Sequence, residues 1–89
     1  MQFEWDRIKE KHNIKKHGIS FDEAVTVFYD PLSATFYDPD HSIDEIRLIT
    51  IGCSSHGRMF VVSHTERGAA IRIISARPAT AQERKRHES

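Results

Sequence analysis

The sequence has a single cysteine, no long apolar run and no excess of charge of either sign. Cys53 alone cannot form an internal disulfide, and its neighbours Gly52, Ser54 and Ser55 lack the His or Asn context of a thiol enzyme. No apolar stretch approaches the roughly 20 residues of a membrane-spanning helix, and the first ten residues lack the apolar core of a signal peptide. These absences predict a cytoplasmic protein.

The size and composition predict one small globular domain over residues 1–89. Hydrophobic residues make up 38% of the chain and charged residues 29%, which argues against disorder. The charges are unevenly spread. Residues 29–46 contain five acids and no Lys or Arg, whereas residues 64–89 contain six cations and three acids. A basic end of this kind can attract nucleic acid, although a solvated surface is the commoner explanation.

Local patterns predict an α+β domain with two N-terminal helices, a four-stranded antiparallel sheet and a C-terminal helix. After a strand-like start at Phe3–Trp5, helices are expected over 8–17, stopped by Gly18, and from the capping box at Ser20 to Asp30-Pro31. Strands are expected over 32–37, 45–51, 59–62 and 69–74. A second capping box over residues 80–83 opens the terminal helix.

The turn residues make a prediction about which side chains share a face of the sheet. A two-residue turn at His56-Gly57 places Arg47 opposite Glu66, with Arg47, His64 and Glu66 on one face. The alternative for Arg47 and Glu66 is a plain surface ion pair. At the next turn, a two-residue Arg67-Gly68 connection pairs His64 with Ile71, and a bulged turn pairs it with Arg72.

Polar and cationic residues at the ends of the last two strands form one expected cluster: His64, Glu66, Arg67, Arg72 and Arg77. Arginine matches phosphate oxygens in a bidentate geometry and keeps its charge. Acid-base groups beside fixed guanidinium groups suit a phosphodiester, so RNA is the natural substrate. The alternative for Arg72 and Arg77 is a structural ion pair with Glu66 or Glu83.

Several motifs, in order and covering essentially the whole chain, resemble the BrnT family of toxins. They are Phe3-Glu4-Trp5-Asp6, Lys16-His17-Gly18, Phe21-Asp22-Glu23-Ala24, Asp30-Pro31, Thr65-Glu66-Arg67-Gly68 and Ile73-Ile74-Ser75-Ala76-Arg77. The resemblance implies a ribonuclease toxin of a type II toxin-antitoxin pair with a fold similar to the RelE-like toxins. It implies a BrnA-like, ribbon-helix-helix antitoxin as partner, operator DNA bound only through the complex, and is compatible with a toxin dimer within a heterotetramer.

The implied chemistry is metal-independent RNA cleavage that inhibits translation, with no cofactor. The 2′-hydroxyl is the nucleophile, so the protein needs a base, an acid and cationic stabilisation of the phosphorane. Glu66 or His64 is the candidate base, and Arg67, Arg72 and Arg77 are the candidates for phosphate stabilisation. Further RNA-binding candidates are Lys16, His17, Arg47, Arg84, Lys85 and Arg86.

Residue His87 and the segment 38–41 allow more than one interpretation. Family members often place an aromatic residue near the end of the terminal helix, where this chain has His87. The segment Asp38-Pro39-Asp40-His41 offers oxygen and nitrogen ligands, but without further His or Cys at ligand spacing it is usually a polar turn, and no metal site is expected.

The competing function is a noncatalytic module that binds RNA or docks a protein.

Overall fold

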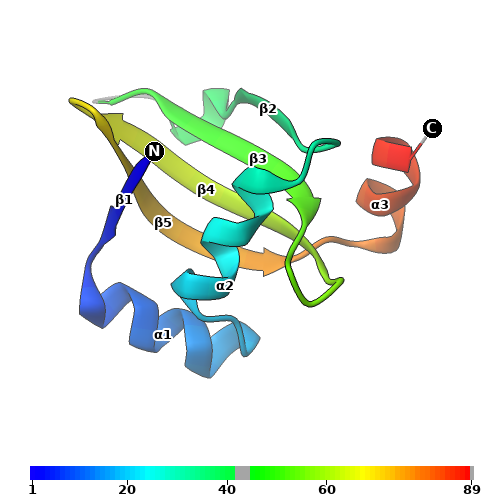
Figure 1. Cartoon of the computed structure of the whole chain (residues 1–89), viewed down its shortest axis with the longest axis horizontal. Helices are drawn as coiled ribbons and strands as arrows, with labels where there is room; N and C mark the ends of the chain where they lie inside the picture. The colour runs from blue at the N-terminus through cyan, green and yellow to red at the C-terminus, as the bar shows by residue number, and fades with distance from the viewer. Residues whose placement is uncertain (42–44, 89) are drawn as a thin grey trace.

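The computed structural model describes residues 1–41 and 45–88, so Asp44 of the acidic segment lies outside it. Two helices precede most of the sheet and a third follows it (Figure 1). None of the helices in the described part of the chain is long and apolar enough to cross a membrane. The elements are β1 (Gln2–Trp5), α1 (Arg7–His17), α2 (Phe21–Val25), η1 (a 3-10 helix, Thr26–Tyr29), β2 (Ala34–Tyr37), η2 (a 3-10 turn, Pro39–His41), β3 (Arg47–Cys53), β4 (Met59–Arg67), β5 (Ala70–Pro78) and α3 (Ala81–Glu88).

The sheet has five strands in the order β1-β5-β4-β3-β2. β2 to β5 are antiparallel neighbours as predicted, but β1 pairs with β5 in parallel, with Phe3 opposite Ile71 and Trp5 opposite Ile73. The α+β class is therefore confirmed, whereas the four-stranded, purely antiparallel sheet is wrong. The alternation of apolar and polar residues over 2–5 marks β1 as a strand. Nothing local in the sequence indicates that this strand joins the far edge of a sheet built from residues 34–78.

Local capping signals set the helix ends. Asp6 accepts hydrogen bonds from the Ile8 and Lys9 amides at the start of α1, and Gly18 ends the helix in the left-handed conformation with φ 69°. Ser20 caps α2 by accepting from the Glu23 amide at 3.1 Å. The second predicted helix is present but short, because it tightens after Val25 into η1 and ends at Asp30.

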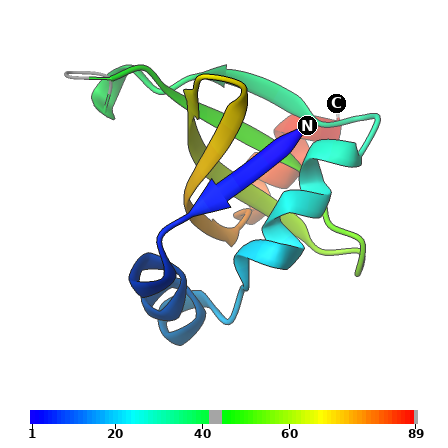
Figure 2. The same ribbon diagram turned by 60° about the vertical axis from the view of Figure 1, so that its left-hand side comes forward.

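One face of the sheet carries the hydrophobic core and is covered by α1, α2 and η1 (Figure 1). The fully buried side chains come from both layers: Ile19, Phe21, Ala24 and Val27 from the helical layer, and Phe60, Val62, Ile73 and Ala76 from the strands. In Figure 2, α3 lies on the far side of the strands from β1, α1 and α2. The second face of the sheet is thus left for α3 and solvent.

Asn13 ties α1 to the sheet. Its side chain donates to the carbonyls of Ile19 (3.0 Å) and Ala76 (2.9 Å) and accepts from the Ala76 amide (3.0 Å). β1 pairs with β5 only over Ala70–Ile73, so the Asn13 amide takes the place of a strand partner farther along β5. This buried contact fixes the segment of β5 that leads to Arg77.

The β3–β4 register differs by one residue from the predicted one. Ser54 donates to the Arg58 carbonyl and Gly57, with φ 78°, donates to Ser54, so the loop has three residues, 55–57, instead of two. Arg47 therefore lies opposite Thr65, and Leu48 opposite His64. Because side chains alternate along a strand, Arg47 faces away from the helices while His64 and Glu66 face the helical side.

The β4–β5 register also differs from both predicted alternatives. A two-residue Gly68-Ala69 turn pairs Arg67 with Ala70, and an extra residue, Ile74, forms a bulge. His64 consequently pairs with Ile73. The bulge also places Arg72 and Arg77 on the same face, although five residues separate them and a regular strand would point them to opposite faces.

Candidate functional site

The face of the sheet opposite α1 and α2 has a cavity of about 460 Å³ beside α3. Its floor is apolar, and its charged groups come from the end of β5 and from α3. The lining residues are Ala34, Phe36, Ile49, Ile51, Val61, Arg77, Glu83, Arg86 and His87. We call this the Arg77 pocket. It combines a hydrophobic surface with two guanidinium groups, a carboxylate and an imidazole.

Arg77 and Glu83 form a bidentate ion pair at the pocket wall. The guanidinium donates to the two carboxylate oxygens at 2.7 and 2.8 Å. The hydrogen bond from Arg77 is the main reason that the pKa of Glu83 falls to about 2, and it also raises the pKa of Arg77. Both groups are charged at neutral pH. This pair confirms the ion-pair alternative for Arg77, whereas Arg72 pairs with Glu4 at 3.2 Å instead of Glu66 or Glu83.

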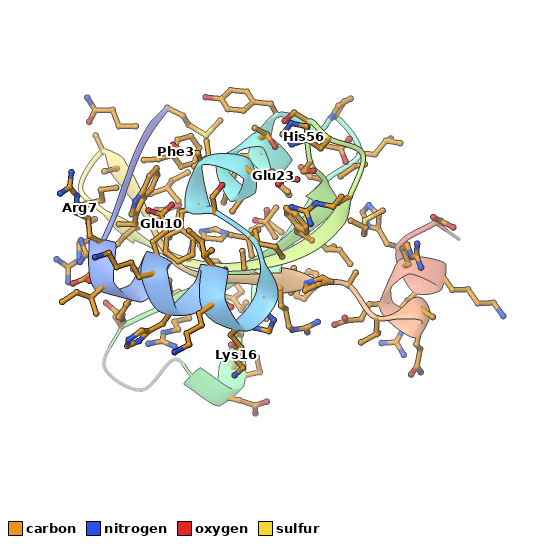
Figure 3. All side chains as sticks on the ribbon, turned by 90° about the horizontal axis from the view of Figure 1, so that it is seen from below. Phe3, Arg7, Glu10, Lys16, Glu23 and His56 are labelled. Carbon is orange, nitrogen blue, oxygen red and sulfur yellow. The ribbon has the colours of Figure 1, made fainter. Side chains whose placement is uncertain are left out.

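Glu83 also orients α3. The predicted capping box is complete, since the Glu83 amide donates to the Thr80 hydroxyl at 3.1 Å and the Thr80 amide donates to the Glu83 carboxylate at 2.9 Å. One carboxylate therefore fixes both the start of the helix and the Arg77 side chain. α3 extends from the end of the sheet, away from α1 and α2 (Figure 3), and carries Arg86 and His87 to the pocket.

The far end of α3 approaches the end of η1. Hydrogen bonds from the Cys53 and Leu32 amides lower the pKa of Asp30, and the charge of His87 contributes a smaller lowering. His87 thus lies within electrostatic reach of Asp30 while it lines the pocket. A histidine is the side-chain type suited to exchanging protons near neutral pH.

His64 lies on the opposite face of the sheet from this pocket. Its side chain is 3% exposed, it packs edge-on against Phe28 with centroids 4.8 Å apart, and its Nε2 is 2.7 Å from the Thr50 hydroxyl. Burial lowers the pKa of His64 to about 4, so the ring is neutral at physiological pH. The expectation that His64 belongs to one cluster with the arginines is wrong, because His64 alternates with Phe60 and Val62 along β4 and so shares their core-facing side of the sheet.

The other members of the expected cluster are also dispersed. Glu66 and Arg67 are exposed residues beside the β4–β5 turn. Arg72 shares the open face with Arg77, but five residues of strand at about 3.3 Å each place their backbones roughly 16 Å apart. Of the five residues expected to form the catalytic cluster, the structure brings only Arg77 to the pocket.

The predicted RNA-binding residues separate in a similar way. Arg47 lies on the open face at the Arg72 end, with its Nε 4.0 Å from Glu45. Lys16 and His17 end α1, and Figure 3 shows Lys16 projecting away from α2. Of the three basic residues of α3, Arg86 lines the Arg77 pocket, Arg84 lines a separate cavity with Arg58, and Lys85 is exposed.

Comparison with known proteins identifies the family. Residues 5–83 match the family described as "Ribonuclease toxin, BrnT, of type II toxin-antitoxin system". The chain belongs to the BrnT family. The crystal structure of the ribonuclease toxin BrnT from Brucella abortus is similar to it, with a TM-score of 0.66 and 26% identity over 90% of this chain and 97% of that chain. No curated protein sequence matches the chain.

Membership of the BrnT family makes the chain a ribonuclease toxin of a type II toxin-antitoxin system, which implies an antitoxin partner. Within residues 1–41 and 45–88, no three His, Cys, Asp or Glu side chains are placed to hold a metal ion together. The predicted polar turn at residues 38–41 contains the 3-10 turn η2.

Two ionisable residues of the pocket, Glu83 and His87, were not among the site residues expected from the sequence. The sequence indicated Glu83 only as an ion-pair partner and a capping residue, and His87 only as a replacement for an aromatic residue. The apolar floor of the pocket was not expected either. The sequence did contain a signal that relates Glu83 to His87. The capping box marks Glu83 as the third helical position, and residues four apart on a helix lie on the same face. Nothing in the sequence placed that face over β5.

Proposed function

We propose that this BrnT-family toxin cleaves RNA without a metal ion in the Arg77 pocket. The observation that carries the proposal is the convergence of Arg77, Arg86 and His87 on one cavity with an apolar floor. Two guanidinium groups can bind a phosphodiester, and the apolar floor, which includes Phe36, can hold an unstacked base. Clusters of this composition fit single-stranded RNA better than a small neutral ligand.

The chemistry uses the nucleophile that RNA supplies. Attack of the 2′-oxygen on phosphorus expels the 5′-oxygen and leaves a 2′,3′-cyclic phosphate, so one group removes a proton and another returns one to the leaving oxygen. We assign removal of the 2′-hydroxyl proton to His87, and solvent water returns a proton to the leaving 5′-oxygen; Arg77 and Arg86 stabilise the charge that develops on the phosphorane. His64 has no part in this scheme because it is buried on the other face.

Glu83 acts through Arg77. A carboxylate whose pKa is about 2 is a weak base at neutral pH, so we assign Glu83 to positioning and not to proton removal. Its bidentate contact occupies the same guanidinium edge that a phosphate would use. RNA binding therefore requires the phosphate to share Arg77 with Glu83 or to displace it.

The partner in this proposal is a BrnA-like antitoxin, and the cellular effect is inhibition of translation through loss of RNA in the cytoplasm. An antitoxin that covers the Arg77 pocket blocks RNA and neutralises its arginines together. Operator DNA would be bound by the antitoxin in the complex, and a toxin dimer within a heterotetramer is compatible with this arrangement.

The test compares four purified proteins on a defined RNA in EDTA: wild type, Arg77→Ala, His87→Ala and Arg72→Ala. We expect wild type to leave 2′,3′-cyclic phosphate ends. His87→Ala should lower the cleavage rate by about 10²–10⁴-fold, the range for loss of one acid-base group. Arg77→Ala should lower it by at least about 10²-fold, as for loss of a transition-state donor.

Arg72→Ala is the matched control, because Arg72 is an arginine of the same strand and the same face at the other end. It should retain cleavage within about tenfold, since it changes the overall charge equally but leaves the pocket intact. Equal losses for Arg72→Ala and Arg77→Ala would refute the assignment of the site. Cleavage that requires added Mg²⁺ would refute the metal-independent mechanism.

A further inference from the structure

The outer edge of β2 is the most exposed apolar feature of the sheet. All four β2 residues are exposed, with Phe36 at 51% and Tyr37 at 69%, and Leu32 just before the strand is 77% exposed. β2 pairs only with β3 in the described part of the chain, so one side of its backbone is open. Exposed edges with apolar side chains are surfaces to which other chains add as strands.

The hydrogen-bonding pattern shows which backbone groups are offered. Asp38 donates to the carbonyl of Arg47, directly opposite it in the β2–β3 register. Because antiparallel partners alternate between hydrogen-bonded and non-hydrogen-bonded pairs, Phe36 and Ala34 also point their amides toward β3. The amides and carbonyls of Thr35 and Tyr37 consequently point outward, spaced for an added strand.

The opposite edge of the sheet does not offer the same surface. Phe3 and Trp5 of β1 are partly buried and pack against the core, where Phe3 contacts Phe28 and Trp5 contacts Phe21. The two other residues of β1, Gln2 and Glu4, are polar. Only β2 combines an open backbone with exposed aromatic side chains.

The charge around β2 indicates what kind of chain binds there. Residues 29–46 contain five acids and no Lys or Arg. Antiparallel pairing of two copies through β2 would bring two such segments together, which like-charge repulsion disfavours. A different chain with apolar side chains and flanking basic residues would be attracted.

We propose that the antitoxin docks on this toxin as an extended segment that adds a sixth strand to the outer edge of β2. Its apolar side chains pack beside Phe36 on the open face and Tyr37 on the other, and its flanking basic residues meet Asp38 and Asp40, which follow β2. Because Phe36 and Ala34 also line the Arg77 pocket, the added strand runs along the pocket rim. The inference rests on the proposed BrnA-like partner but not on the proposed cleavage mechanism.

The test is residue-resolved amide exchange of the toxin, free and in complex with the BrnA-like antitoxin purified from co-expression. We expect exchange of the Thr35 and Tyr37 amides to slow at least tenfold in the complex. The Phe36 amide, already bonded to β3, should change much less. This alternation is specific to strand addition and would not arise from side-chain docking alone. An unchanged rate at residues 35 and 37 in the complex would overturn the proposal.

Variants provide a second readout through the dissociation constant. Thr35→Pro removes one outward amide without removing a backbone bond to β3, and Tyr37→Ser removes an exposed aromatic side chain; each should weaken antitoxin binding at least tenfold. Thr35→Val loses the hydroxyl contact with Thr50 (2.7 Å) but keeps the outward amide, so it should bind as wild type does. Ile8→Ser is the matched control, since Ile8 is 65% exposed on α1, and should bind as wild type does. RNA cleavage by Thr35→Pro confirms that the variant is folded.

Three other outcomes would overturn the proposal in distinguishable ways. Concentration-dependent protection of residues 35 and 37 in the free toxin would assign this edge to a second copy of the chain. Wild-type affinity in folded Thr35→Pro and Tyr37→Ser would place the antitoxin elsewhere. Failure of the wild type to bind the antitoxin would refute the proposed partner as well, whatever the RNA assay gives.

Discussion

Asn13→Ala should destabilise the protein more than most single changes at other buried positions. The substitution removes three hydrogen bonds and leaves the amide and carbonyl of Ala76 and the carbonyl of Ile19 without their side-chain partner. Each such bond contributes about 0.5–1.5 kcal/mol net, and unpaired buried groups cost more, so the free energy of unfolding should fall by roughly 2–5 kcal/mol. At about 4–8 °C per kcal/mol for a domain of this size, Tm should drop by roughly 8–40 °C.

The measurement is urea denaturation of wild type, Asn13→Ala and the control His12→Ala, which changes an exposed neighbour on the same helix. We expect a lower midpoint with an unchanged m-value for Asn13→Ala only. Asn13→Asp keeps the acceptor for the Ala76 amide but places a carboxylate against two carbonyls, so it should be at least as unstable as the alanine variant. A loss below about 1 kcal/mol in Asn13→Ala would refute the view that this side chain replaces a strand partner.

Two further changes test the packing of η1 on the same, helix-covered face of the sheet. Burial lowers the pKa of His64 from 6.5 to about 4, so the unfolded chain binds the extra proton first and stability should fall as pH drops from 6.5 to 4. The His64 contribution to this loss is about 3 kcal/mol at 1.36 kcal/mol per pH unit, and it levels off below pH 4. Urea titrations of His64→Gln at different pH values should lack this contribution. The pKa of Glu83 falls from 4.5 to about 2, so its contribution to stability is lost below about pH 4.5, and the loss between pH 6.5 and 4.5 is assigned to His64. Gly52→Ala would bring a methyl group within 2.9 Å of the Ser33 Cβ and 3.0 Å of a Val27 methyl, so it should cost about 1–3 kcal/mol in urea denaturation; wild-type stability would contradict this close approach.

The features that were predictable from the sequence are those whose signals are local. Ser20 and Thr80 mark helix starts because their hydroxyl groups cap amides within three residues, and Gly18 marks a helix end because it adopts a positive φ. The alternation at Phe3 and Trp5 likewise identifies a strand. In each case the energetic reason for the structure lies within a few residues of the signal.

The incorrect predictions all depended on contacts between segments far apart in the sequence, or on the length of a loop. The sequence at His56-Gly57 fits a two-residue and a three-residue loop, and that one residue decides whether Arg47 shares a face of the sheet with His64. The bulge at Ile74 has no composition signal, yet it places Arg72 and Arg77 on one face. Arg77 was correctly singled out for its charge at a strand end, but the position of its neighbour His87 depends on how α3 folds back over the sheet.

The parallel pairing of β1 with β5 has a consequence for the order in which the toxin can fold during synthesis. Residues 2–5 are translated well before their partner residues 70–73, which follow three other strands and the helices α1 and α2. Until then, Phe3 and Trp5 have no sheet to join, and the core that they complete stays open. The helix that carries Arg86 and His87 emerges later still. A nascent chain therefore gains a closed core only after β5 has been made, and a formed pocket only after α3 has followed it.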